Sequence, residues 1–181
     1  MYFMINIFLN IMIDKENQRI LFICMGNICR SPIVEAVARV EFARAGVAVH
    51  AESAGTEDYH VGQPADRRAI RIAEANAYPL AAHRARQVCN EDFETFDHLL
   101  VMDHVNLRAL ERWRSAWTLV APRLFLAEAG LGDVHVPDPY YGTDVDFERV
   151  VALARSGVNA LIKRLSSDTR RAGDGHAQAG T

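Results

Sequence analysis

Apolar positions along the chain follow two alternating spacings. The segment 19–24, "RILFIC", is a short continuous apolar run, which is typical of a strand buried on both faces. The segment 31–46 that follows, "SPIVEAVARVEFARAG", begins with Ser-Pro and ends with Gly. Its residues Ile33, Val37 and Val40 recur at the spacing of one helix face. The pattern therefore predicts a strand followed by a helix.

The alternation of strand and helix continues toward the C-terminus. The pattern predicts strands at 47–56 and 97–103, helices at 66–77 and 106–115, and a helical turn at 91–96 with Asn90 as its cap. Between 118 and 136 the pattern is ambiguous, and a short strand is placed at 117–121. The last helix is the clearest, because one apolar stripe runs through it: Phe147, Val150, Val151, Ala154, Val158, Leu161, Ile162 and Leu165.

Strands that alternate with helices predict the fold class. We expect an α/β three-layer sandwich with a central parallel sheet of about four strands and helices on both faces. In such folds ligands bind beyond the carboxyl ends of the strands. Cys24 is the last residue of the first predicted strand, so that strand would deliver it to the ligand edge. A phosphate-binding loop is expected there, between strand 1 and helix 1.

The 181 residues suggest one domain, which we place at 18–166. Residues 1–17 are predicted to be an extension outside the core, with Met12 as an alternative start. Its apolar run is too short to span a membrane and lacks the features of a secretory signal. A contact with a membrane surface or a partner is the alternative for this extension. The tail 167–181 is small and polar, which predicts disorder.

Composition excludes several classes of function. A formal net charge of -3 without a basic stripe gives no basis for nucleic-acid binding. Three cysteines make no disulfide framework and contain no C-x-x-C pair, so we expect reduced thiols and a cytoplasmic protein. The seven histidines show no metal-ligand spacing in sequence. No metal or other cofactor is expected, and no membrane is required.

The residues after Cys24 suit an oxyanion site. Gly26 and Asn27 tolerate positive φ, so the short loop can turn its N–H groups inward. The N-terminus of the following helix and the Arg30 guanidinium add positive charge and further donors. This arrangement would hold a tetrahedral oxyanion above the Cys24 sulfur. It is not a Walker loop, because it lacks Gly-Lys-Ser/Thr.

The same groups would activate the sulfur. A free thiol titrates near pH 8.5, so full ionisation raises the thiolate population at pH 7 by only about thirtyfold. The larger contribution must come from positioning and from donors matched to the transition state. A small buried cysteine before an ordinary helix is the alternative for Cys24 alone. The complete pattern C-x5-R-S at a strand-to-helix junction favours catalysis.

"CMGNICRSP", at 24–32, strongly resembles the signature of the low-molecular-weight protein tyrosine phosphatases. The resemblance extends from about Arg19 to Leu165. Its second specific element is "DPYYG", at 138–142, followed by Phe147. Three intermediate stretches also match: "ESAGT", "ARQVCNEDFETFDHLLVMD" and "NLRAL".

The resemblance implies a phosphotyrosine phosphatase that works through a phosphocysteine intermediate. Cys24 would be the nucleophile, Arg30 would bind the phosphate and stabilise the transition state, and Asp138 would be the general acid and then the base. Ser31 would stabilise the thiolate by a hydrogen bond. Asn27 would hold the shape of the loop, supported by Ser53 and His83.

Substrate binding would involve the loop and the aromatic walls around it. The residues implied are Met25, Gly26, Asn27, Ile28, Cys29, Ser31, Tyr59, Tyr140 and Tyr141, with His60 beside Tyr59. A deep aromatic slot would admit phosphotyrosine and leave the shorter phosphoserine out of reach. Phosphotyrosine proteins are the expected partners, together with a bacterial-type tyrosine kinase. Asp103 is a candidate support for the loop or the acid, with an ordinary strand-end residue as the alternative.

Several alternatives stay open. A thiol-based arsenate reductase uses a similar loop but needs a later cysteine pair, and Cys89 is alone. A protein arginine phosphatase has a small polar residue where this chain has Ile28. A non-catalytic oxyanion- or phosphopeptide-binding module would not need its cysteine. Cys24 and Cys29 are spaced for a protective disulfide, and an inert Cys29 is the alternative.

Overall fold

A computed structural model describes residues 18–113 and 120–174. Its centre is a parallel sheet with the strand order β2-β1-β3-β4. The strands are β1 (Gln18–Cys24), β2 (Val49–Gly55), β3 (His98–Val101) and β4 (Arg123–Leu124). In the register Cys24 lies opposite Gly55 of β2, and Ile23 lies opposite Val101 of β3. The carboxyl ends of the three longer strands therefore meet at one edge.

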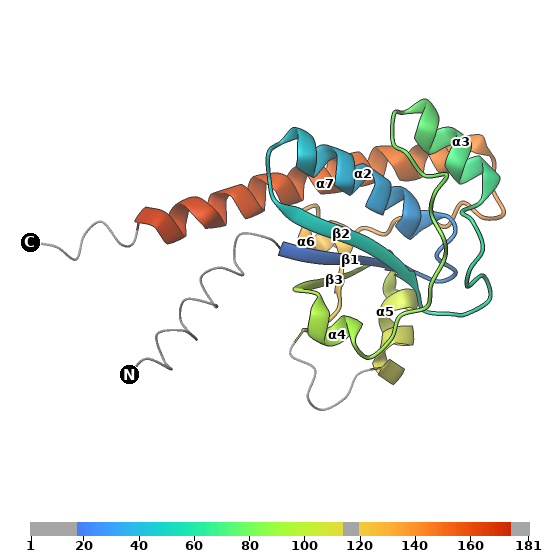
Figure 1. Cartoon of the computed structure of the whole chain (residues 1–181), viewed down its shortest axis with the longest axis horizontal. Helices are drawn as coiled ribbons and strands as arrows, with labels where there is room; N and C mark the ends of the chain where they lie inside the picture. Colours follow the sequence, from blue (N-terminus) through green and yellow to red (C-terminus); the bar gives the residue numbers. More distant parts are fainter. Residues whose placement is uncertain (1–17, 114–119, 175–181) are drawn as a thin grey trace, which may run out of the picture.

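Helices cover both faces of this sheet, which confirms the predicted layers. On one face lie α2 (Arg30–Arg44), α3 (Arg67–Ala75) and α7 (Asp144–Asp174), as Figure 1 shows. The opposite face carries α4 (Asp92–Thr95) and α5 (His104–Leu110), which continues into a 3₁₀ turn (Glu111–Trp113). The short helix α6 (Phe125–Glu128) follows β4 directly.

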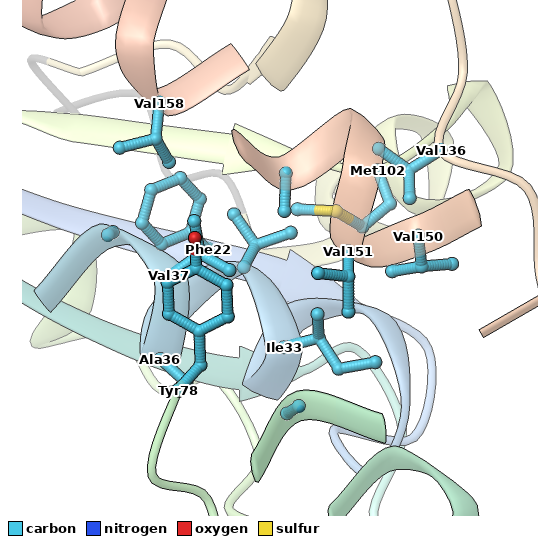
Figure 2. Packing of buried hydrophobic residues seen from close by; sticks show 14 of the residues in the cluster. Phe22, Ile33, Ala36, Val37, Tyr78, Met102, Val136, Val150, Val151 and Val158 are labelled. Atoms are coloured by element: carbon cyan, nitrogen blue, oxygen red, sulfur yellow. The ribbon is translucent and has the colours of Figure 1, made fainter. Parts of the chain in front are cut away.

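The central position of β1 in the sheet explains why its sequence is continuously apolar. Ile20 and Phe22 contribute to the core beneath α2 and α7, whereas Leu21 and Ile23 contribute to a second core on the other face. Successive side chains of a strand point to opposite faces, so a central strand needs apolar residues at every position. Figure 2 shows the first of these cores, in which Phe22, Ile33 and Val151 come from a strand and two helices.

Some local predictions need correction. Asn90 does not cap α4: the helix begins at Asp92, its N-cap is Glu91, and no side-chain cap bond forms. The strand predicted at 117–121 falls partly on 114–119, outside the described residues, and the structure places β4 later, at Arg123–Leu124. This edge strand pairs with β3 through only two residues, and a strand of that length is too short to show a periodic pattern in the sequence.

The last helix is longer than predicted. α7 continues to Asp174, past the predicted beginning of the tail at 167, because an established helix extends at little cost through polar residues. The extension at 1–17 and the end of the tail at 175–181 lie outside the described residues. No helix in the described part of the chain combines the length and the apolarity needed to cross a membrane.

Candidate active site

The candidate site lies where the strand order reverses, between β1 and β3 at the carboxyl edge. β1 ends at Cys24, and the loop 25–29 joins it to α2, which begins at Arg30. Cys24 and Arg30 are both buried, with exposed fractions of 3% and 2%. The strand thus brings the sulfur to the site, and the helix places the guanidinium beside it.

The loop 25–29 turns its carbonyl groups outward. Four carbonyl oxygens, counting that of Cys24, accept hydrogen bonds from donors outside the loop. The carbonyls of Cys24 and Met25 accept from the backbone N–H groups of Thr56, at 2.9 Å, and Glu57, at 3.0 Å. Those of Asn27 and Ile28 accept from His83 Nε2, at 2.8 Å, and Asp66 N, at 2.9 Å. Across a planar trans peptide, the next N–H points the opposite way. The corresponding amides therefore face the interior of the loop, which is the geometry of an anion nest.

Asn27 is the central support of this loop. Its backbone has φ 53°, in the left-handed region that asparagine tolerates. Its Nδ2 donates to Ser31 Oγ and Ser53 Oγ, both at 2.9 Å, and its Oδ1 accepts from Arg86 N at 2.9 Å. Asn27 and Ser31 are fully buried. The structure thus brings together Asn27, Ser31, Ser53 and His83, although His83 contacts the main chain of Asn27 and not its side chain.

A second group of contacts supports Ser53 and was not anticipated from sequence. Ser53 Oγ donates to Glu35 Oε2 at 2.6 Å, and His83 Nδ1 lies 3.9 Å from the same oxygen. Glu35 belongs to the second turn of α2. A glutamate on an otherwise ordinary helix carries no local signal of this role.

The Cys24 sulfur has a hydroxyl donor directly against it. Ser31 Oγ lies 3.0 Å from Cys24 Sγ and donates to it. The same hydroxyl accepts from Asn27 Nδ2 and also lies 3.3 Å from the carbonyl oxygen of Ala54. The N-terminus of α2, a helix of 15 residues, adds partial positive charge at the same place. The hydroxyl and the helix N-terminus thus both face the Cys24 sulfur.

Arg30 is held by two carboxylates. Its Nη1 donates to Asp103, the N-cap residue of α5, and its Nη2 lies 2.6 Å from Asp138 Oδ2. Burial by itself would lower the pKa of Arg30, but the charges of Cys24, Asp138 and Asp103 raise it above its usual value. The guanidinium therefore stays charged. Asp103, a candidate support in the sequence, contacts Arg30 directly.

Asp138 lies half-exposed at the mouth of the site. Its side chain is 47% exposed, and its Oδ1 accepts from Tyr140 N at 3.1 Å. The position suits a group that exchanges protons with a bound substrate and with water. The structure thus brings Asp138 to Arg30, 108 residues earlier in the sequence, at the same edge of the sheet as Cys24.

Arg68 of α3 holds the segment that follows Asp138. Its guanidinium donates to the carbonyls of Tyr140, at 2.9 Å, and Gly142, at 3.2 Å. It also pairs with Asp66 at 2.8 Å, and Asp66 N in turn bonds to Ile28 O. Arg68 and Asp66 thus connect the segment after Asp138 to the loop 25–29. Sequence reasoning missed both residues, because they look like ordinary polar residues at the start of an amphipathic helix.

The predicted aromatic walls differ in their placement. Tyr140 and Tyr141 have their ring centroids 4.9 Å apart, edge to face, and Tyr141 is 97% exposed. Tyr59 lies in the turn after β2 and is also largely exposed. Its neighbour His60 lies against the loop, since a Cβ on Gly26 would be 2.9 Å from its Cδ2. Contact of these tyrosines with a substrate stays a prediction.

The remaining loop residues have contrasting surroundings. Met25 is partly exposed, whereas Ile28 and Cys29 are buried in the core beneath α2. All three cysteines are free thiols. Burial, followed by the charge of Asp66, raises the pKa of Cys29, so this thiol stays protonated at neutral pH. Pairing between Cys24 and Cys29 stays a prediction.

Comparisons with known proteins agree with this geometry. The family model described as low molecular weight phosphotyrosine protein phosphatase matches residues 19–171. The human protein of that name is 38% identical over 143 residues, which cover 77% of this chain and 90% of that protein. A low molecular weight protein-tyrosine-phosphatase from Streptomyces coelicolor is 39% identical over 150 residues, covering 80% of this chain and 91% of that protein.

A solved structure gives the same result in three dimensions. The protein tyrosine phosphatase from Entamoeba histolytica, with Hepes in its active site, superimposes with a TM-score of 0.78 and 31% identity. The match covers 84% of this chain and 99% of that chain. Sequence, fold and the described arrangement around Cys24 agree, and the chain belongs to the low molecular weight phosphotyrosine protein phosphatase family.

Proposed function

We propose that this protein hydrolyses phosphotyrosine in proteins through a phosphocysteine on Cys24. The observation that carries the proposal is the Cys24 sulfur at the base of a loop whose amides face inward, with Arg30 beside it and Asp138 at the mouth. A site that only bound anions would not need a nucleophile at its base. Family membership supports the same reaction.

In the first step the Cys24 thiolate attacks phosphorus and the bond to the tyrosine oxygen breaks. The loop amides and Arg30 bind the three equatorial oxygens, where negative charge is spread in the transition state. Asp138, in its protonated form, gives its proton to the departing phenolic oxygen. The products of this step are the tyrosine and a phosphorylated Cys24.

In the second step water attacks the phosphocysteine. Asp138 is now a carboxylate, and it removes a proton from the water as the new P–O bond forms. The S–P bond breaks, the electron pair returns to sulfur, and inorganic phosphate leaves. Ser31 donates to Cys24 Sγ at 3.0 Å, so it would stabilise the thiolate that departs in this step. The cycle consumes one water and needs no cofactor.

The setting of the reaction follows from its chemistry. A catalytic thiolate must stay reduced, and the cytoplasm keeps thiols reduced, so we place the protein there. Its substrates are made by a tyrosine kinase. We include a bacterial-type tyrosine kinase as a partner, because bacterial proteins are among its similar relatives.

The first test is hydrolysis of phosphotyrosine, phosphoserine and phosphoarginine peptides with a chelator present. We expect turnover of phosphotyrosine, no detectable turnover after Cys24→Ser, and unchanged turnover after Cys89→Ser, which removes a cysteine remote from the mechanism. Asp138→Asn should lower kcat by about 10²–10⁴-fold on phosphotyrosine. Its effect should be smaller on p-nitrophenyl phosphate, whose phenol leaves readily without a proton.

Several outcomes would contradict the proposal. Turnover that survives Cys24→Ser excludes the phosphocysteine. Binding of phosphotyrosine peptides without turnover would leave an anion-binding module. Preference for phosphoarginine, or reduction of arsenate by the protein with a thiol reductant, would assign one of the two related activities instead.

A further inference from the structure

Two histidines and an aspartate converge outside the candidate active site. Nε2 of His104 lies 3.0 Å and 3.3 Å from the two carboxylate oxygens of Asp133. Nε2 of His135 lies 4.0 Å from Asp133 Oδ1. The two imidazole rings are edge to face with centroids 4.8 Å apart, and one ligand atom from each residue lies within 4.8 Å of the others. Among the described residues, 18–113 and 120–174, these three form the group of His, Cys, Asp and Glu side chains that could hold a metal ion.

The backbone that carries these residues is fixed by the core. His104 is the first residue of α5, and His135 directly precedes Val136. Val136 N donates to Met102 O at 2.9 Å. The side chains of Val136 and Met102 are buried together in the core, as Figure 2 shows. The buried side chains of Val136 and Met102 hold the backbone next to His104 and His135 in place. The two exposed imidazoles would therefore need only small side-chain rotations to bind a metal ion.

We propose that His104, Asp133 and His135 bind a divalent transition-metal ion, with Zn²⁺ as the ion that fits best. Two imidazoles and a carboxylate are a ligand set for zinc and not for Mg²⁺ or Ca²⁺, which prefer oxygen alone. Zinc bonds of about 2.0–2.1 Å place tetrahedral ligands roughly 3.3–3.4 Å apart. The separations from Asp133 Oδ1, 3.0 Å to His104 Nε2 and 4.0 Å to His135 Nε2, bracket that value. Water would take the fourth position.

The bound ion would join two separate segments of the chain. His104 and Asp133 are 29 residues apart, and the ion would tie the start of α5 to the segment that leads to Asp138. An ion that binds the folded chain and not the unfolded chain raises the unfolding temperature. This inference does not depend on the proposed phosphatase activity, since it concerns other residues and a different ligand.

The test is zinc titration of the full chain without a histidine tag, by calorimetry and by thermal unfolding. The background variant Cys24→Ser removes a competing thiolate. We expect one zinc site and a higher unfolding temperature, with affinity at least about tenfold weaker in His135→Gln and in Asp133→Asn. His50→Gln is the matched control, because His50 is also exposed and pairs with a carboxylate, Glu52, at 2.8 Å. It should bind zinc like its parent.

Cobalt gives an independent readout of the ligands. Co²⁺ in this site should show visible ligand-field bands without the near-ultraviolet band of a cobalt–thiolate bond. Zinc affinity that is equal in the parent and in His135→Gln would overturn the proposal, as would the absence of zinc binding. In the latter case the three residues serve only as a hydrogen-bonded surface contact.

Discussion

Arg30 illustrates how a single residue can serve two states of the site. The guanidinium is buried and pairs with Asp103 and Asp138. An unpaired charge in that position would be costly, so the two carboxylates allow Arg30 to be buried without a ligand. Arginine has five N–H donors in a planar fork, so donors remain for a phosphate. Lysine in this position would lack that geometry.

Cys29 is the second thiol of the loop, and its surroundings oppose reaction. Burial and the charge of Asp66 raise its pKa, so the less nucleophilic protonated form dominates at neutral pH. We expect iodoacetate, whose carboxylate suits the loop, to modify Cys24 and leave Cys29 free. Peptide mass spectrometry after timed labelling measures both sites.

Two controls sharpen this prediction. Inorganic phosphate should protect Cys24, because both anions compete for the same loop amides. Cys29→Ser should be labelled at Cys24 at the rate of the unchanged protein. Labelling of Cys29 as fast as Cys24 would show that its thiol is more accessible and more ionised than its burial implies.

At the scale of elements, the loop 25–29 depends on the end of β2. Gly55 lies opposite Cys24 in the sheet, and a Cβ on Gly55 would be 2.7 Å from Met25 O and 3.3 Å from the Asn27 Cβ. The first of these atoms is backbone and cannot rotate away. A glycine here lets β2 approach the loop closely.

Gly55→Ala should therefore displace the loop. We expect kcat/KM on phosphotyrosine to fall by about tenfold to 10²-fold, because small shifts of positioned donors are costly to catalysis. Gly46→Ala is the control: Gly46 has φ +65° in open space, so alanine there strains a turn without approaching the site. It should lose stability and keep its kcat/KM. Normal kinetics in Gly55→Ala would mean that β2 does not determine the loop shape.

At the scale of the whole molecule, α7 holds the sheet and α2 together. Its buried residues Phe147, Val150, Ala154 and Val158 belong to the larger core. Gly157 lies on the same helix where it crosses α6. A Cβ on Gly157 would overlap Cζ of Phe125 and lie 2.8 Å from its Cε1. Phe125 is buried and packs edge to face against Phe22 of β1, so it has little room to move.

Gly157→Ala should thus destabilise the protein, although alanine favours a helix over glycine by about 1 kcal/mol. We expect the free energy of unfolding to fall by about 1–3 kcal/mol in urea denaturation, since overpacking a core costs that much. Ser156→Ala, an exposed neighbour on the same helix, should be neutral or slightly stabilising. A more stable Gly157→Ala would show that Phe125 moves freely.

Much of this architecture could be predicted because its signals are local. The run at 19–24, the helix at 31–46 and the stripe from Phe147 to Leu165 each depend on spacing within one element. The sequence-based prediction was wrong where the local pattern is weak, at β4, which has two residues, and at the N-cap of α4. Arg68, Glu35 and Gly55 were missed because each contacts a segment outside its own element: Arg68 contacts Tyr140, Glu35 contacts Ser53, and Gly55 lies against Met25.

The sequence by itself determined the alternation of strands and helices, the position of Cys24 at a strand end, and the pairing of a C-x5-R-S loop with a distant Asp-Pro. Only the tertiary structure decided which side chains meet there. Arg30 contacts Asp103 and Asp138 across 73 and 108 residues, and His104 meets Asp133 and His135 on another surface. Periodicity is set by neighbours within a few residues, whereas these contacts depend on strand order and register, which place distant segments side by side.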